Sequence, residues 1–225
     1  MLVDNDEHLN GDDWAERSSS AKKRFLASMV MDYEKWHDGT GYDLAALDEM
    51  TQEDLQEIEG ILRTKLDEPW RTFEALDRIN TPASLSEIER ALKHTNLEVR
   101  IAAARFSRER ESERERVLVE ALANAEFYGG LTQALDQVET FHPPAIVDAL
   151  IRGLLMRGDS GAVSFAGMLL YIFGKADSSF DWEQRPLFLR FGAQNIEDRR
   201  KAFVELCEII GVDASRYLTE RSDPC

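Results

Sequence analysis

The sequence predicts an all-α protein made of consecutive helical hairpins, and three observations support this. Apolar residues recur every three or four positions between residues 44 and 174, which is the spacing of one face of a helix. Residues with capping and turn chemistry interrupt that periodicity at short intervals. Hydrophobic residues make up 43% of the chain and charged residues 31%, a composition typical of a soluble globular protein.

The N-terminal residues 1–28 are acidic and polar and include the triplet Ser18–Ser20. They offer few apolar side chains for burial, so we expect a mobile acidic tail, although residues 22–31 are also compatible with a short amphipathic helix. The packed domain is expected over residues 29–225. Its first part, residues 32–43, is an aromatic stretch that ends in a glycine-containing turn.

Helical segments follow one another from residue 44 onward. Thr51 begins a segment that resembles a capping box, Pro69 suits the first turn of a helix, and Asn96 suits the position just before one. The expected hairpins pair 44–66 with 69–79, 83–93 with 96–107, 115–124 with 130–141, and 145–156 with 160–174.

The regular pattern ends at about residue 175. Residues 180–191 are rich in aromatic and charged side chains, and helical periodicity returns over 196–210 and briefly over 216–218. We therefore expect an irregular helical cap that shields the last hairpin.

Residues 91–104 resemble a HEAT repeat, in which a polar turn leads into a helix that opens with a capping residue, Val-Arg and small residues. Here Asn96 is the capping residue, Val99-Arg100 follows, and Ala102–Ala104 supplies the small side chains. The resemblance implies a right-handed α-solenoid of about four HEAT-like helical hairpins, each burying its apolar face against its neighbours. Scaffolds of this kind usually bind other molecules.

The formal net charge is −16, from 43 acidic and 27 basic residues. This charge opposes binding to nucleic-acid phosphates, and it favours either basic protein partners or simple solubility. The first ten residues lack the order of a signal peptide, and the longest apolar run, 167–174, is too short to span a bilayer. A cytoplasmic location is the expectation, with no membrane association.

No pattern in the sequence indicates catalysis, so we expect a protein that is not an enzyme and uses no cofactor or metal. The four histidines are scattered at positions 8, 37, 94 and 142, and no Cys-x-x-Cys motif is present. The Gly-Asp-Ser-Gly sequence at 158–161 lies in a helical context, which does not suit a serine nucleophile.

Residues 43–68 contain nine acidic residues and only two basic ones. One interpretation is a solvated helix face; the other is a surface that attracts a basic protein and raises its association rate. The candidate partner-binding carboxylates are Asp43, Asp48, Glu49, Glu53, Asp54 and Glu57.

The aromatic segment 180–191 is the second candidate surface. Trp182, Arg185 and Phe188 are residue types that dominate binding hot spots, although they also suit packing of the cap onto the hairpins. A third aromatic group, formed by Tyr33, Trp36 and Tyr42, fits either a surface or a seal on the first hairpin.

The arrangement of residues 31–218 also resembles small bacterial HEAT-like proteins that neutralise secreted toxins. The similarity lies in the Asp32–Trp36 opening with its following Gly-Thr-Gly-Tyr-Asp, the central repeats, and the close from Asp181-Trp182 through Arg185-Pro186 to Phe191. It implies an immunity-type inhibitor, in which acidic residues occlude the basic active site of a toxin or effector domain. The alternative is a general scaffold or adaptor protein without toxin neutralisation.

Overall fold

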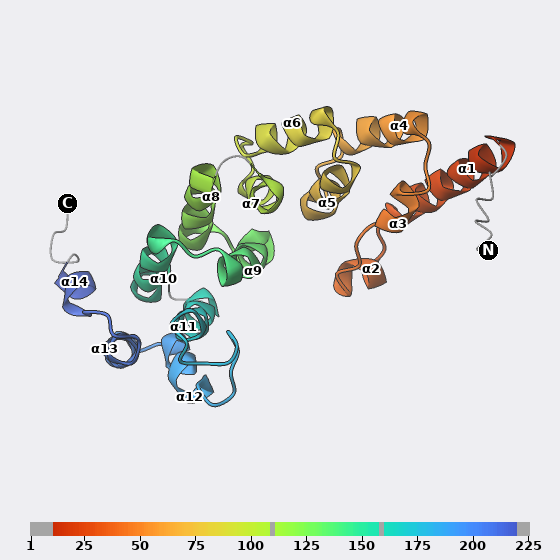
Figure 1. Ribbon diagram of the computed structural model, residues 1–225. Helices are drawn as coiled ribbons and strands as arrows, with labels where there is room; N and C mark the ends of the chain where they lie inside the picture. The colour runs from red at the N-terminus through yellow and green to blue at the C-terminus, as the bar shows by residue number, and fades with distance from the viewer. Residues whose placement is uncertain (1–10, 109–110, 158–159, 220–225) are drawn as a thin grey trace, which may run out of the picture. The chain divides into compact units, whose positions relative to one another are not determined.

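The computed structural model describes residues 11–108, 111–157 and 160–219. The fold is all-α, 73% helical, and these described residues form no strand. Two compact units divide the chain between His94 and Thr95. Figure 1 labels the helices in chain order.

Residues 11–94, the described part of the first unit, form six helices. They are α1 (Gly11–Ser28), α2 (Tyr33–His37), α3 (Leu44–Leu47), α4 (Gln52–Leu62), α5 (Pro69–Ile79) and α6 (Pro82–Ala91). α1 packs on α3 and α4, and α5 packs on α3, α4 and α6. The expected helix over 44–66 is two helices, because Thr51 adopts an extended conformation and caps α4 by accepting a hydrogen bond from the Asp54 N–H at 3.3 Å.

The segment Gly11–Ser28, expected within a mobile tail, forms helix α1. Its buried face consists of Ser18, Ala21 and Phe25, which recur at helical spacing and continue to Met29. Two of these residues are small, so they contribute little to the apolar signal in the sequence, but they allow α1 to approach α3 and α4 closely. Residues 1–10 lie outside the described part of the chain.

A buried arginine holds the loop after α2. Arg71 is only 2% exposed, and its side chain donates to the carbonyl oxygens of Thr40 at 2.7 Å and Lys35 at 3.4 Å and to the carboxylate of Glu68. These contacts satisfy the charge that burial would otherwise penalise. They fix the position of α2 on the first unit.

The second unit contains the remaining helices. They are α7 (Leu97–Phe106), α8 (Glu111–Asn124), η1 (Phe127–Leu131), α9 (Thr132–Thr140), α10 (Pro144–Met156), α11 (Ser160–Ile172), α12 (Arg185–Phe188), η2 (Leu189–Gly192), α13 (Ile196–Ile210) and α14 (Ser215–Leu218). Successive helices pack in order: α7 on α8, α8 on α9 and α10, and α10 on α11. This packing is compatible with a helical array.

Several local predictions are confirmed. Asn96 caps α7 by accepting a hydrogen bond from the Glu98 N–H at 2.9 Å, and Pro69 begins α5. The expected pairs 44–66 with 69–79, 115–124 with 130–141 and 145–156 with 160–174 correspond to helices that pack together. The pair 83–93 with 96–107 would join helices of different units, and it stays a prediction.

After residue 175 the chain turns back onto α11. α12, η2 and α13 all contact α11, and α13 occupies the range expected for it. Residues 220–225 lie outside the described part of the chain. Among the described helices, none combines the length and the apolar character needed to cross a bilayer.

Candidate functional site

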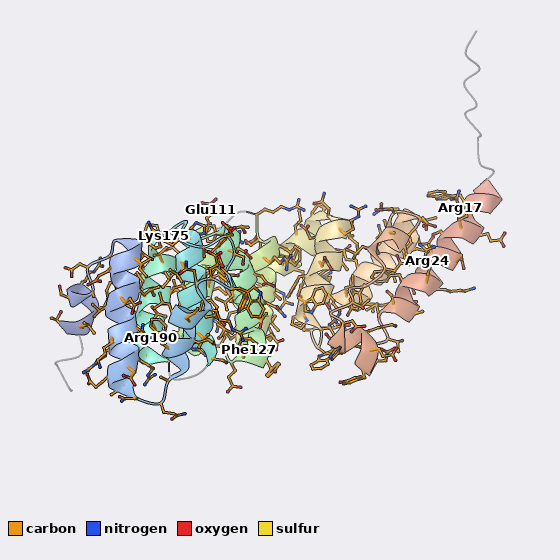
Figure 2. The ribbon with its side chains drawn as sticks, turned by 90° about the horizontal axis from the view of Figure 1, so that it is seen from below. Arg17, Arg24, Glu111, Phe127, Lys175 and Arg190 are labelled. Atoms are coloured by element: carbon orange, nitrogen blue, oxygen red, sulfur yellow. The ribbon has the colours of Figure 1, made fainter. Side chains whose placement is uncertain are left out.

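The acidic candidate residues lie in the first unit, on α3, α4 and the loops that border them. Asp43 caps α3, and its carboxylate accepts a hydrogen bond from Arg24 of α1 at 2.7 Å. The same guanidinium bonds to Glu49 at 2.9 Å. Figure 2 labels Arg24 on α1. One arginine from the segment expected to be a tail therefore neutralises two of the predicted partner-binding carboxylates.

A second group of α1 side chains contacts α4. Lys22 forms ion pairs with Asp54 at 2.9 Å and with Glu57 at 2.5 Å. The buried Ser18 hydroxyl also donates to Asp54, and it accepts from the Thr51 N–H at 2.7 Å. The hydrogen bond from Ser18, together with that from Lys22, lowers the pKa of the Asp54 carboxyl below its usual value.

Asp48 forms an ion pair with Arg78 of α5, whereas Glu53 is exposed and makes no ion pair with another described residue. Five of the six acidic candidates are thus matched by cations of their own unit. This pairing weakens the field that the segment 43–68 presents to a distant basic protein. Whether these residues contact a partner stays a prediction.

The aromatic candidates lie in the second unit: Trp182 is in the connection between α11 and α12, and Arg185 and Phe188 are on α12. This connection passes very close to α11 at Gly167, where a Cβ atom would lie 2.2 Å from the carbonyl oxygen of Ser179. Only a glycine admits so close an approach of backbone to a helix. The sequence of α11 therefore sets the path of the segment that carries the aromatic residues.

Asp181 braces the turn that presents the aromatic side chains. Its carboxylate accepts hydrogen bonds from the N–H groups of Asp177 at 3.0 Å and Glu183 at 2.8 Å. These backbone hydrogen bonds lower the pKa of the Asp181 carboxyl. The turn is held on both sides of Trp182, and α12 begins three residues after that tryptophan.

Trp182 and Arg185 stack on each other at the surface. The Cζ atom of Arg185 lies 4.5 Å from the centroid of the Trp182 ring, within the range of a cation–π contact. Trp182 is nevertheless 76% exposed, and Phe180 is 64% exposed. Phe188, by contrast, is buried, so its ring contributes to the floor of the site.

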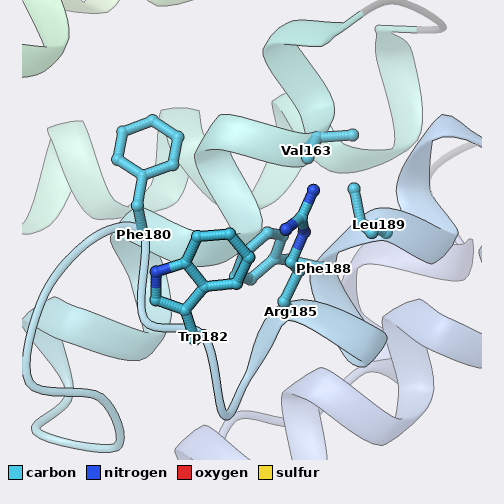
Figure 3. A pocket seen from close by; sticks show the side chains of 6 residues that line it. All are labelled: Val163, Phe180, Trp182, Arg185, Phe188 and Leu189. Carbon is cyan, nitrogen blue, oxygen red and sulfur yellow. The ribbon is translucent and has the colours of Figure 1, made fainter.

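These side chains surround a surface pocket of about 330 Å³ (Figure 3). Figure 3 shows the Phe180 and Trp182 rings on one side and Leu189 on the other, with the Arg185 guanidinium pointing between them toward Val163 of α11. We call this site the α11–α12 pocket; its lining residues are Val163, Phe180, Trp182, Arg185, Phe188 and Leu189. All three predicted residues of the aromatic segment belong to it.

The sequence did not single out Val163, Phe180 or Leu189. Phe180 and Leu189 fall within the segment 180–191 and share its aromatic and apolar composition, which was a usable signal. Val163 lies on a helix with apolar residues on every side, so no local pattern distinguishes it from the core. Val163 lines the pocket only because the chain between α11 and α12 folds back onto α11.

The third aromatic group divides between core and surface. Tyr42 is buried and packs edge to face on Phe25, with ring centroids 5.8 Å apart. Tyr33 and Trp36 of α2 are exposed and lie against each other. Their ring centroids are 6.4 Å apart.

In the described residues, no group of three or more His, Cys, Asp and Glu side chains is placed to hold a metal ion. The α11–α12 pocket brings together apolar surface and one guanidinium. Neither a family model, nor a curated protein, nor a solved structure matches the chain. Within the described ranges, the chain is an all-helical protein of about 14 helices.

Proposed function

We propose that the chain is a protein-binding helical module whose main contact surface is the α11–α12 pocket. The supporting observation is the set of large aromatic side chains left exposed around a pocket in the second unit. Clustered exposed apolar surface of this kind marks interaction sites in soluble proteins, and tryptophan and arginine are the residues most enriched among binding hot spots.

The proposed biological role is inhibition of a toxin or effector domain by covering its active site. The resemblance of residues 31–218 to toxin-neutralising helical proteins supports this role, and so does the net charge of −16, which favours a basic partner. In this proposal, the pocket anchors the partner, and unneutralised carboxylates such as Glu53 contribute to the rate of association.

A scaffold or adaptor role is the second candidate. It is favoured by the ion pairs that Lys22, Arg24 and Arg78 form with the acidic segment, because carboxylates already paired within the first unit have less charge to offer a basic active site. In that case the α11–α12 pocket would hold a partner without abolishing its activity.

The test is co-expression of the chain with the product of the neighbouring gene, with growth and co-purification as readouts. We expect Trp182→Ala to abolish both rescue of growth and co-purification. Trp36→Ala is the matched control, since Trp36 is also an exposed tryptophan but lies in the first unit, and it should leave both unchanged.

Co-purification without any rescue of growth would support the scaffold role instead. Equal loss of binding in both tryptophan variants would count against the α11–α12 pocket as the contact surface. Each variant is first compared with the wild-type chain by circular dichroism, so that loss of folding is not read as loss of binding.

A further inference from the structure

The α11–α12 pocket has one charged group in an otherwise apolar lining. Valine, leucine and three aromatic side chains form its walls and floor, and the Arg185 guanidinium lies among them. A group that binds in this pocket must therefore contact apolar side chains and one positive charge at the same time. Among apolar groups of similar size, the charge of Arg185 favours those that also carry a negative charge.

Arg185 forms no ion pair with any described residue, and its guanidinium lies on an aromatic ring instead. The neighbouring Arg190 is bound to Glu205, and Arg152 and Arg200 are bound to carboxylates on their own helices. The chain carries a large excess of acidic residues, so a carboxylate partner for Arg185 would be easy to supply. The guanidinium instead rests on the face of an indole ring.

The preceding turn holds two carboxylates, those of Asp181 and Glu183, and neither forms an ion pair with Arg185. Asp181 points toward the backbone N–H groups of Asp177 and Glu183, and those hydrogen bonds hold it within the turn. It braces the loop rather than neutralising Arg185. Among the six residues that line the pocket, Arg185 alone carries a charge.

Stacking leaves the hydrogen-bonding capacity of Arg185 intact. A cation–π contact uses the face of the guanidinium plane, whereas the five N–H donors lie in that plane and point outward. A planar carboxylate can accept two of them in parallel, which is the strongest pairing that arginine forms with an organic anion. Trp182 thus orients Arg185 for an incoming carboxylate.

The size of the pocket limits the apolar part of the occupant. A volume of about 330 Å³ lies at the lower end of the range for small-ligand sites, roughly 300–1,000 Å³. It suits one or two side chains of a partner protein better than a cofactor. Its position on an open surface also suits a segment that lies across it.

We propose that the α11–α12 pocket binds a partner segment in which a large apolar side chain is adjacent to a carboxylate, with the apolar group between Phe180, Trp182 and Leu189 and the carboxylate on Arg185. This inference rests on the proposed protein-binding function and adds the chemistry of the contact. The overall charge of the protein opposes anions, so any preference for a carboxylate must come from Arg185 itself.

The experiment uses three small probes that share a phenyl group and differ in charge: 4-phenylbutyrate, 4-phenylbutanamide and 4-phenylbutylamine. Each is titrated into the full chain, and binding is followed by the NMR signal of the Trp182 indole N–H, assigned with Trp182→Phe. We expect 4-phenylbutyrate to bind about two- to five-fold more tightly than the amide, the range of a partly exposed ion pair. The amine should bind most weakly.

The control variant Arg185→Gln keeps a planar polar group but removes the charge. It should lose the preference for the carboxylate, so that the carboxylate and the amide bind equally. Arg190→Gln, at an arginine already paired with Glu205, should keep that preference. Equal binding of the carboxylate and the amide to the wild-type chain would overturn the proposal, as would a preference that survives in Arg185→Gln.

The two proposals fail separately. If Trp182→Ala loses the protein partner but the wild-type chain shows no preference for the carboxylate probe, the binding function stands and the inferred chemistry is wrong. If the preference is present but Trp182→Ala retains its partner, the pocket has the inferred chemistry and the partner contacts another surface.

Discussion

Gly167 controls how closely the connection before α12 approaches α11, and Gly167→Ala tests that dependence. The added methyl carbon would lie 2.2 Å from the Ser179 carbonyl oxygen, whereas real Cβ atoms essentially never approach another heavy atom within 3.0 Å. The obstructing atom belongs to the backbone and cannot rotate away. The connection must therefore move outward by at least about 0.8 Å, and overpacking of this kind costs about 1–3 kcal/mol.

Gly60→Ala is the matched control for the helical effect of alanine. Gly60 lies in α4, is exposed, and would place its new methyl group in open space. It should stabilise the first unit by about 0.5–1 kcal/mol, because glycine loses more backbone entropy on helix formation. Gly167→Ala should show the same gain minus the cost of the clash, which gives a net destabilisation of the second unit.

Hydrogen exchange of backbone amides provides the assay, because the two glycines lie in different units and each unit reports its own opening free energy. We also expect the Trp182 indole signal to shift in Gly167→Ala and to stay unchanged in Gly60→Ala. If Gly167→Ala proved as stabilising as Gly60→Ala, the close approach at Ser179 would be refuted, together with its role in shaping the pocket.

Two further predictions concern buried polar groups. Ser18→Ala removes the hydroxyl that bonds to Asp54 and should cost about 1–3 kcal/mol at pH 7, whereas exposed Ser20→Ala should cost little. Because folding lowers the pKa of Asp54, the ionised carboxylate stabilises the folded state above the unfolded pKa of about 3.9, and this stabilisation is lost as pH falls through the folded pKa. The difference in unfolding free energy between the two variants, measured by urea denaturation, should therefore shrink below about pH 4. A difference that stays constant with pH would contradict this. Burial raises the pKa of the Cys207 thiol to about 11, so in a Cys225→Ser background Ellman's reagent at pH 8 should label it only after unfolding; rapid labelling of the folded chain would show that the thiol is accessible.

The helical fold was predictable because its signals are local. Pro69 and Asn96 mark helix starts through the backbone conformations and hydrogen bonds that they favour, and the apolar spacing of residues 196–210 is enough to define α13. Residues 22–31 carried a helical signal, but the first part of α1 was missed because Ser18 and Ala21 bury surface through close approach rather than through hydrophobic size. Such a face has almost no periodic apolar signal.

The candidate site was predictable only where residue type alone indicates the role. Trp182 and Arg185 are unusual enough in composition to be chosen from the sequence, and the structure brings them together with Phe188. The pairing of Arg24 with Asp43 joins residues far apart in the chain, and no local pattern indicates it. A charged surface inferred from one segment of sequence therefore leaves out the opposite charges that folding places beside it from other segments.

The central claim is that the α11–α12 pocket is where a protein partner binds. Hydrogen–deuterium exchange of the full chain, alone and in complex with the product of the neighbouring gene, tests it directly. We predict slower exchange over residues 178–191 in the complex, with little change over residues 43–57. Protection of 43–57 with unchanged exchange over 178–191 would contradict the claim and place the contact on the acidic segment.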